Sequence, residues 1–133
     1  EKYDSIISEI PNGCRVKLFT RYISDNEVPL FFSASDVCVL PYRSATQSGI
    51  SAISFHFDVP MITTDVGGLK EAIEVPGTGI VVKSVDPVMV REAIEDFFNK
   101  ELGCKFKENI AVQKDRLSWK NFADRLLDFY LTL

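Results

Sequence analysis

The stretch DVPMITTDVGGLKEAI, residues 58–73, decides the fold class of this chain. Residues 60–64 form a short apolar and β-branched run, which is typical of a strand. Residues 65–68 include two adjacent glycines, which favour a tight turn. Residues 69–73 then predict a short helix. A strand that passes through a turn into a helix is the repeating unit of an α/β domain.

The same unit occurs on both sides of this stretch. Residues 37–40 are an apolar run without alternation, as expected of a strand that is covered on both faces. A polar loop, 42–48, and an apolar helix, 49–57, follow it. Further along, strand 80–82 precedes a helix that Asp86 caps. The sequence therefore predicts a Rossmann-like α/β domain with a parallel sheet flanked by helices.

The two ends of the chain are less regular. Residues 2–10 predict a helix, and the alternation over 14–20 predicts a strand. Ser24 and Glu27 have the spacing of a capping box, in which Ser24 accepts the amide of Glu27 and Glu27 reaches back. Another helix is expected after Ser118. The charged residues 99–117 show the least periodicity, so we expect them to form a surface crossing.

Composition limits the function classes. The chain has 133 residues, the size of one domain, and a net charge of -4, which disfavours nucleic acid as a partner. Cys14, Cys38 and Cys104 form no CxxC pair, so neither a zinc site nor a disulfide framework is expected. No run approaches the ~18 apolar residues of a membrane span. We expect a cytoplasmic protein.

The loop 42–49 is the first candidate site. Ligands of open α/β sheets bind outside the carboxyl ends of the strands, where helix starts offer free amides to anions. This loop would supply the donors to a diphosphate: Arg43, Ser44, Thr46, Gln47, Ser48 and Gly49. The alternative is a polar loop in which Ser48 is an ordinary helix N-cap.

The second candidate site is the turn with Asp65, Gly67 and Gly68. Asp65 would either cap the next helix or face a ligand, and the alternative is a tight turn without a ligand. The lone His56 lies in an apolar helix, where a packed or rim position is expected. The sequence contains no metal cluster or DxD pair, so we expect neither a metal nor another cofactor.

These segments resemble the retaining GT-B glycosyltransferases of family four. Residues 33–41 are similar to the strand before that family's donor loop, and residues 58–71 are similar to its pattern G-K-P-V-I-(A)-S/T-D-V-G-G-x-x-E. Residues 79–82 match the following strand, and Ser118-Trp119 match the start of the closing helix. The resemblance covers almost the whole chain in consistent order.

The resemblance implies that residues 1–133 are one nucleotide-sugar-binding domain, the carboxyl-terminal half of a two-domain transferase. The whole enzyme would transfer a sugar to a glycan or lipid-linked acceptor with retention and without a metal, in bacterial polysaccharide biosynthesis. The chain alone would be nearly inactive, because the amino-terminal acceptor domain is missing. Any peripheral contact with the membrane would depend on that domain. The alternative is a non-catalytic nucleotide-binding or assembly module.

The sequence departs from the family in two ways. Two family glutamates correspond to Ala45 and Ile53 here, so other groups must contact the sugar and the ribose. The first two strands and a basic pair that grips the phosphates are also missing. We therefore expect either that strand 14–20 pairs directly with strand 37–40, or that a second copy fills the gap by swapping.

Overall fold

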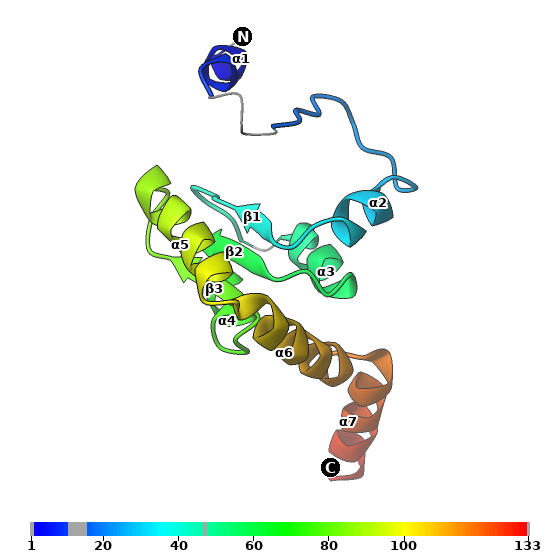
Figure 1. Ribbon diagram of the computed structural model, residues 1–133. Coiled ribbons are helices and arrows are strands. Elements are labelled where there is room, and N and C mark those ends of the chain that lie inside the picture. The colour runs from blue at the N-terminus through cyan, green and yellow to red at the C-terminus, as the bar shows by residue number, and fades with distance from the viewer. Residues whose placement is uncertain (1, 11–15, 47, 133) are drawn as a thin grey trace.

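The computed structural model describes residues 2–10, 16–46 and 48–132, which form short strands and helices in alternation over most of the chain (Figure 1). In chain order the elements are α1 (Lys2–Ser8), α2 (Val28–Ser33), β1 (Cys38–Leu40), α3 (Gly49–His56), β2 (Met61–Thr64), α4 (Leu69–Ile73), β3 (Gly79–Val82), α5 (Pro87–Asn99), α6 (Leu102–Arg116) and α7 (Trp119–Leu131).

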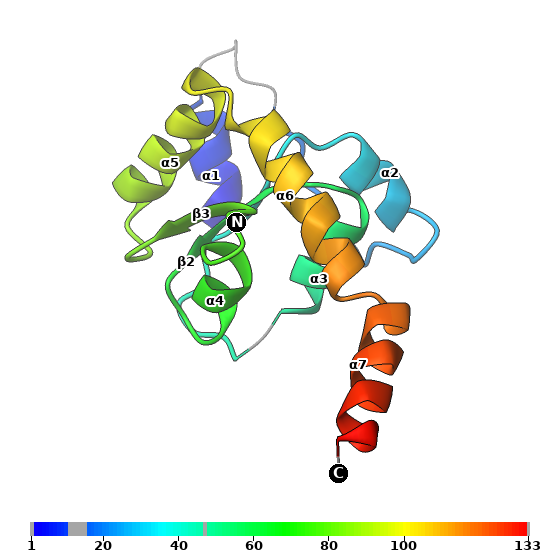
Figure 2. The ribbon, with the colours of Figure 1, turned by 90° about the horizontal axis from the view of Figure 1, so that it is seen from below.

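The three strands form one parallel sheet in the order β1-β2-β3. Val39 pairs with Ile62, and Ile62 pairs with Ile80, so one row of side chains crosses the sheet. Figures 1 and 2 show α5 on one side of the sheet and α3 and α4 on the other. The α/β fold class with a parallel sheet flanked by helices is confirmed.

The core lies on both faces of β2, the central strand, whose four residues are all buried. On one face, Ile62 belongs to a cluster with Phe97 of α5 and Phe106 of α6. Met61 and Ile73, with Ile110 of α6, are also fully buried. Such continuous burial explains why the strands lack the polar alternation of half-exposed sheets.

The prediction of a surface crossing over residues 99–117 is wrong. Residues 102–116 form the helix α6, and its Phe106 and Ile110 are buried against the rest of the domain. These two residues lie four positions apart and therefore share a helix face. The many charged residues between and around them make this short apolar pattern hard to recognise in the sequence.

The predicted strand 14–20 is also wrong over its described part. Residues 16–20 have no strand conformation, and among the described residues β1 pairs only with β2. Residues 14 and 15 lie outside the described residues. Val16, Leu18 and Phe19 are about half exposed, so this segment lacks the strand neighbour that alternation requires. Direct pairing of this segment with β1 is therefore contradicted, and the swap between copies stays a prediction.

The predicted Asp86 cap is confirmed, the predicted Ser24–Glu27 box is confirmed in part, and Ser118 adds a cap that was not predicted. Asp86 accepts a hydrogen bond from the amide of Val88 at 2.9 Å, and Ser118 accepts one from Asn121 at 3.2 Å. Glu27 reaches back to the amide of Ser24 at 3.2 Å. The Ser24 hydroxyl, however, donates to the Glu27 carboxylate at 2.8 Å and does not accept the Glu27 amide.

The carboxyl-terminal helix α7 presents an apolar side to solvent. None of its residues is buried, and Phe122, Leu126 and Phe129 are all more than half exposed. Figure 1 shows α7 extending away from the sheet beyond the end of α6. Within the described residues no helix is long and apolar enough to cross a membrane.

Candidate functional site

The two candidate loops meet at the carboxyl ends of β1 and β2. The amide of Gly68 donates to the carbonyl of Thr46 at 3.1 Å. The Thr64 hydroxyl, at the end of β2, donates to the carbonyl of Tyr42 at 2.5 Å. These bonds join loop 42–49 to turn 65–68, so the two sites that the sequence suggested separately are one continuous surface.

Gly67 brings the two backbones together. Its φ of +54° is in the left-handed region, and a Cβ there would lie 2.0 Å from the Ala45 carbonyl oxygen and 2.8 Å from that of Thr46. A side chain at Gly68 would meet only the Thr46 oxygen, at 3.6 Å. Gly67 is therefore required by the contact between the loops as well as by the turn.

The start of α3 has no side-chain cap. Ser48 occupies the N-cap position, but its hydroxyl bonds to no amide of the helix and lies 3.4 Å from the Tyr42 hydroxyl. The alternative of Ser48 as an ordinary side-chain N-cap is thus contradicted. A Cβ at Gly49 would have no atom within 4 Å. The position of Gly49 at the start of α3 is therefore open, as the close approach of an anion to a helix start requires.

The polar side chains of the first loop are available to a ligand. Arg43, Ser44 and Thr46 are exposed, and Arg43 forms no ion pair with any described residue. A guanidinium on the loop that leads into an uncapped helix start can add a formal positive charge to the partial charge of the helix. Gln47, the remaining predicted donor, lies outside the described residues.

Asp65 does not cap the next helix, so one of the two roles that the sequence suggested for its side chain is contradicted. Its carboxylate lies 3.4 Å from the ammonium of Lys70, and α4 has Gly68 at its N-cap position without a side-chain bond. The hydrogen bond to Asp65 and the negative charges of Asp65 and Glu74 raise the pKa of Lys70. Asp65 therefore links the turn to α4 through an exposed ion pair, and a contact of its carboxylate with a ligand stays a prediction.

The positions of the two family glutamates carry no carboxylate. Ala45 offers only its backbone, and its carbonyl faces Gly67. Ile53 is 37% exposed on α3. His56 is an exposed rim residue whose ring packs edge-on against Phe57, with ring centres 4.9 Å apart, as the sequence predicted. Among the described residues, no group of three metal-ligating side chains gathers.

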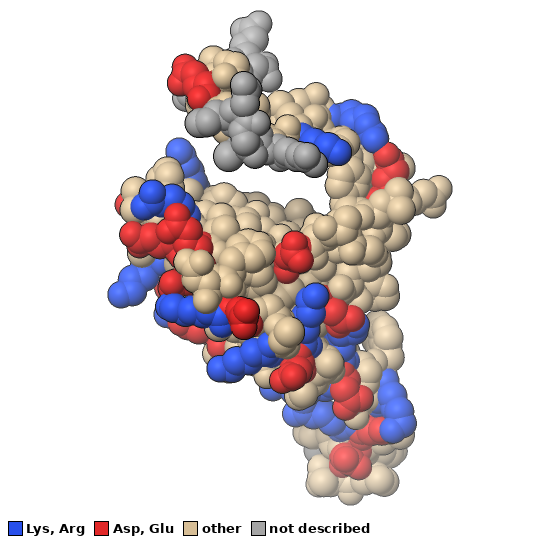
Figure 3. All heavy atoms as spheres, in the orientation of Figure 1, with Lys and Arg blue, Asp and Glu red and all other residues tan. Residues whose placement is uncertain are grey.

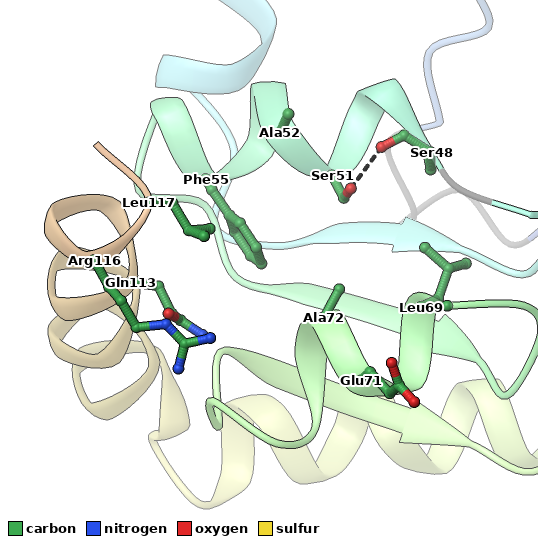
Figure 4. A pocket seen from close by; sticks show the side chains of 11 residues that line it. Ser48, Ser51, Ala52, Phe55, Leu69, Glu71, Ala72, Gln113, Arg116 and Leu117 are labelled. Carbon is green, nitrogen blue, oxygen red and sulfur yellow. Dashed lines mark hydrogen bonds between the residues drawn. The ribbon is translucent and has the colours of Figure 1, made fainter. Parts of the chain in front are cut away.

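A groove of about 510 Å³ opens beside these loops, between α3, α4 and α6 (Figure 4). Ser48 and Gly68 form its rim next to the loops, and Glu71, Gln113 and Arg116 line it farther along. Gln113 and Arg116 were not predicted as site residues, because residues 99–117 were expected to form a surface crossing. The spacing from Phe106 through Ile110 to Gln113 would have placed them on one face of a helix.

Charges of both signs are interspersed over the face of the molecule in Figure 3, where α5, α6 and α7 lie. No extended basic surface is visible on that face. This distribution fits a ligand that is held locally by a few groups, in agreement with the net charge of -4.

The carboxyl ends of the strands, where these two loops meet, are the place at which open α/β sheets bind their ligands. Residues 4–100 match the family model described as "Glycosyl transferases group 1". The chain belongs to the group 1 glycosyltransferase family.

Two relatives and one solved structure extend the comparison. The chain is 27% and 23% identical, each over 108 residues, to the D-inositol 3-phosphate glycosyltransferases of Paenarthrobacter aurescens (strain TC1) and Corynebacterium urealyticum (strain ATCC 43042 / DSM 7109). These matches cover 78% and 80% of the chain and 26% of each relative, so the chain spans about a quarter of their length.

The solved structure is the sucrose-phosphate synthase from Thermosynechococcus elongatus. It superposes with a TM-score of 0.70 over 98% of this chain and 33% of its own, at 22% identity. At that identity the likeness establishes the fold alone.

Proposed function

We propose that this chain is the donor-binding part of a glycosyltransferase and holds the diphosphate of a nucleoside diphosphate sugar. The observation that carries the proposal is the junction of loop 42–49 with turn 65–68 in front of the uncapped start of α3. Membership of the group 1 family supports it, because this junction lies where the resemblance places the donor diphosphate.

The groups at this junction suit the chemistry of sugar transfer. The leaving group gains negative charge on the diphosphate as the bond to the sugar breaks. Amides at the start of α3 and the guanidinium of Arg43 would stabilise that charge. The rest of catalysis would be positioning of the acceptor by the rest of the transferase. We further propose retention of configuration, a mechanism without a metal, and a glycan or lipid-linked acceptor, on the strength of the family resemblance.

A second function is favoured by one observation. Ala45 and Ile53 replace the two carboxylates that would contact the sugar and the ribose. A domain without them could bind a nucleotide in a non-catalytic role or serve in assembly. This alternative predicts that nucleotide binding, if present, does not depend on the sugar.

Calorimetric titration of the chain with UDP, GDP and ADP tests the donor site. One nucleotide should bind in a saturable manner. Arg43→Ala should lower the affinity for that nucleotide about tenfold or more, because it removes a charged hydrogen bond. Arg91→Ala is the matched control, since Arg91 is exposed on α5 away from the loops. Equal affinities of Arg43→Ala and the unchanged chain would contradict the role of this loop.

The result with sugar nucleotides then separates the two functions. A transferase donor site should bind the complete nucleoside diphosphate sugar differently from the nucleoside diphosphate alone. If no nucleotide binds, the titration is repeated with a longer polypeptide that carries the upstream strands. Absence of binding there as well would overturn the proposal.

A further inference from the structure

The groove between α3, α4 and α6 has polar groups that the domain itself does not use. The side chains of Glu71 and Arg116 make no ion pair or hydrogen bond with any described residue. The Oε1 atom of Gln113 is buried and also has no hydrogen-bond partner. Buried polar atoms are nearly always paired, so an unpaired one in a groove calls for an explanation.

These groups surround an apolar surface. Phe55 and Ala52 of α3 and Leu69 of α4 line the groove, and Leu117 closes it beside α6. Figure 4 shows Gln113 and Arg116 on the α6 side and Glu71 on the α4 side, with Phe55 projecting between the helices. An acid, an amide and a guanidinium therefore ring an aromatic and aliphatic floor.

This combination fits one ligand class. A sugar ring has an apolar C–H face, which packs on aromatic and aliphatic side chains, and hydroxyls on its edge, which bond to carboxylates, amides and guanidinium groups. A phosphate would be repelled by Glu71, and a purely apolar ligand would leave all three polar groups unpaired. The volume of about 510 Å³ lies within the ~300–1,000 Å³ of small-molecule sites.

We infer that this groove is a saccharide-binding site, separate from the donor loop, that holds a sugar unit of a neutral glycan. The site shares only Ser48 with loop 42–49 and only Gly68 with turn 65–68. The groove thereby offers a glycan a second binding point, between α3, α4 and α6. The inference does not depend on nucleotide binding, because the groups that carry it lie on α4 and α6.

Amide chemical shifts of the whole chain test this inference. The probes are the methyl α-glycosides of glucose, mannose and galactose and their α-linked disaccharides, each added without nucleotide. At least one probe should shift the amides that line the groove in a saturable manner: Ser51, Ala52, Phe55, Ala72, Gln113 and Leu117.

Matched variants then localise the binding. Glu71→Gln and Arg116→Ala should each weaken it about tenfold, the effect of losing one charged hydrogen bond. Glu92→Gln and Arg91→Ala, both exposed on α5, should leave it unchanged. Arg43→Ala should also leave it unchanged, which separates this inference from the donor site.

Two results would overturn the inference. One is the absence of saturable shifts with every probe. The other is a set of shifts that is confined to residues 44–49, or that persists at full strength in both Glu71→Gln and Arg116→Ala. Binding of a sugar nucleotide to loop 42–49 in the same sample would leave either conclusion intact.

Discussion

A Cβ on Gly67 would lie 2.0 Å from the carbonyl oxygen of Ala45. No side chain fits in that space, so the backbones of two loops that are far apart in the sequence touch directly. Gly67 thereby shapes the loop that precedes α3, whether or not it also contacts a ligand.

Replacement of Gly67 by alanine should therefore disturb both loops. We expect Gly67→Ala to lower the free energy of unfolding by about 1–3 kcal/mol, through the positive φ and the displaced carbonyls. The amide resonances of Ala45 and Thr46 should shift as well. Gly68→Ala is the control, because its Cβ would meet only an oxygen at 3.6 Å. Urea denaturation and amide spectra measure both effects, and equal behaviour of the two variants would contradict this role.

The helix α6 should contribute to stability as a part of the core. Ile110 is fully buried, so Ile110→Ala should lower the free energy of unfolding by about 2–5 kcal/mol. Val112 on the same helix is 70% exposed, and Val112→Ala should change the free energy of unfolding by less than about 0.5 kcal/mol. Denaturation midpoints at constant m-value would show the difference. Similar losses for both variants would mean that residues 102–116 do not pack as described.

Asp58 should accept glycine more readily than alanine. Its φ of 56° is left-handed, and its carboxylate pairs with Lys114 at 2.8 Å. Asp58→Ala loses this exposed pair and still has a Cβ at a left-handed φ. That backbone conformation costs about 1–2 kcal/mol compared with glycine. Asp58→Gly relieves the strain and loses only a pair worth about 0–1 kcal/mol. Thermal or urea unfolding should therefore rank glycine at or near the unchanged chain and alanine below both.

The start of α2 should loosen in strong acid. Hydrogen bonds from Arg21 and from Ser24 lower the pKa of Glu27 to about 2. A carboxylate with a lowered pKa stabilises the folded state above its unfolded pKa, about 4.3, and loses that effect as the pH falls through about 2. Carboxyl chemical shifts of Glu27 should titrate near pH 2 in the unchanged chain and at higher pH in Arg21→Gln. A midpoint near 4.3 in both would refute the pairing.

The predictable part of the fold is the part where local pattern and environment agree. Residues 60–64 are apolar or β-branched, and Met61–Thr64 form the central, fully buried strand. Asp86 and Ser118 cap helices because their side chains need only local partners. The meeting of the two candidate loops also follows from topology, since the carboxyl ends of neighbouring parallel strands share one edge of the sheet.

The rest depended on distant contacts. The charges of α6 made Phe106 and Ile110 hard to recognise as core residues, and Phe106 is buried in a cluster with residues of α5 and the sheet. The alternating side chains of residues 16–20 have no neighbouring strand to pair with, so these residues form no strand. No local signal revealed that Gly67 abuts Ala45, because the two are 22 positions apart. The groove could not be predicted for the same reason, because it forms only where α6 packs beside α3 and α4, which are distant in the sequence.

The order β1-β2-β3 is also the order of the strands along the chain. Cys38 pairs with Met61, 23 residues later, and Met61 pairs with Gly79, 18 residues later. Each pairing closes a loop of modest length, so the contact order of the sheet is low for a parallel architecture. The sheet can therefore grow one strand at a time from its amino-terminal edge, in the direction in which the ribosome delivers it.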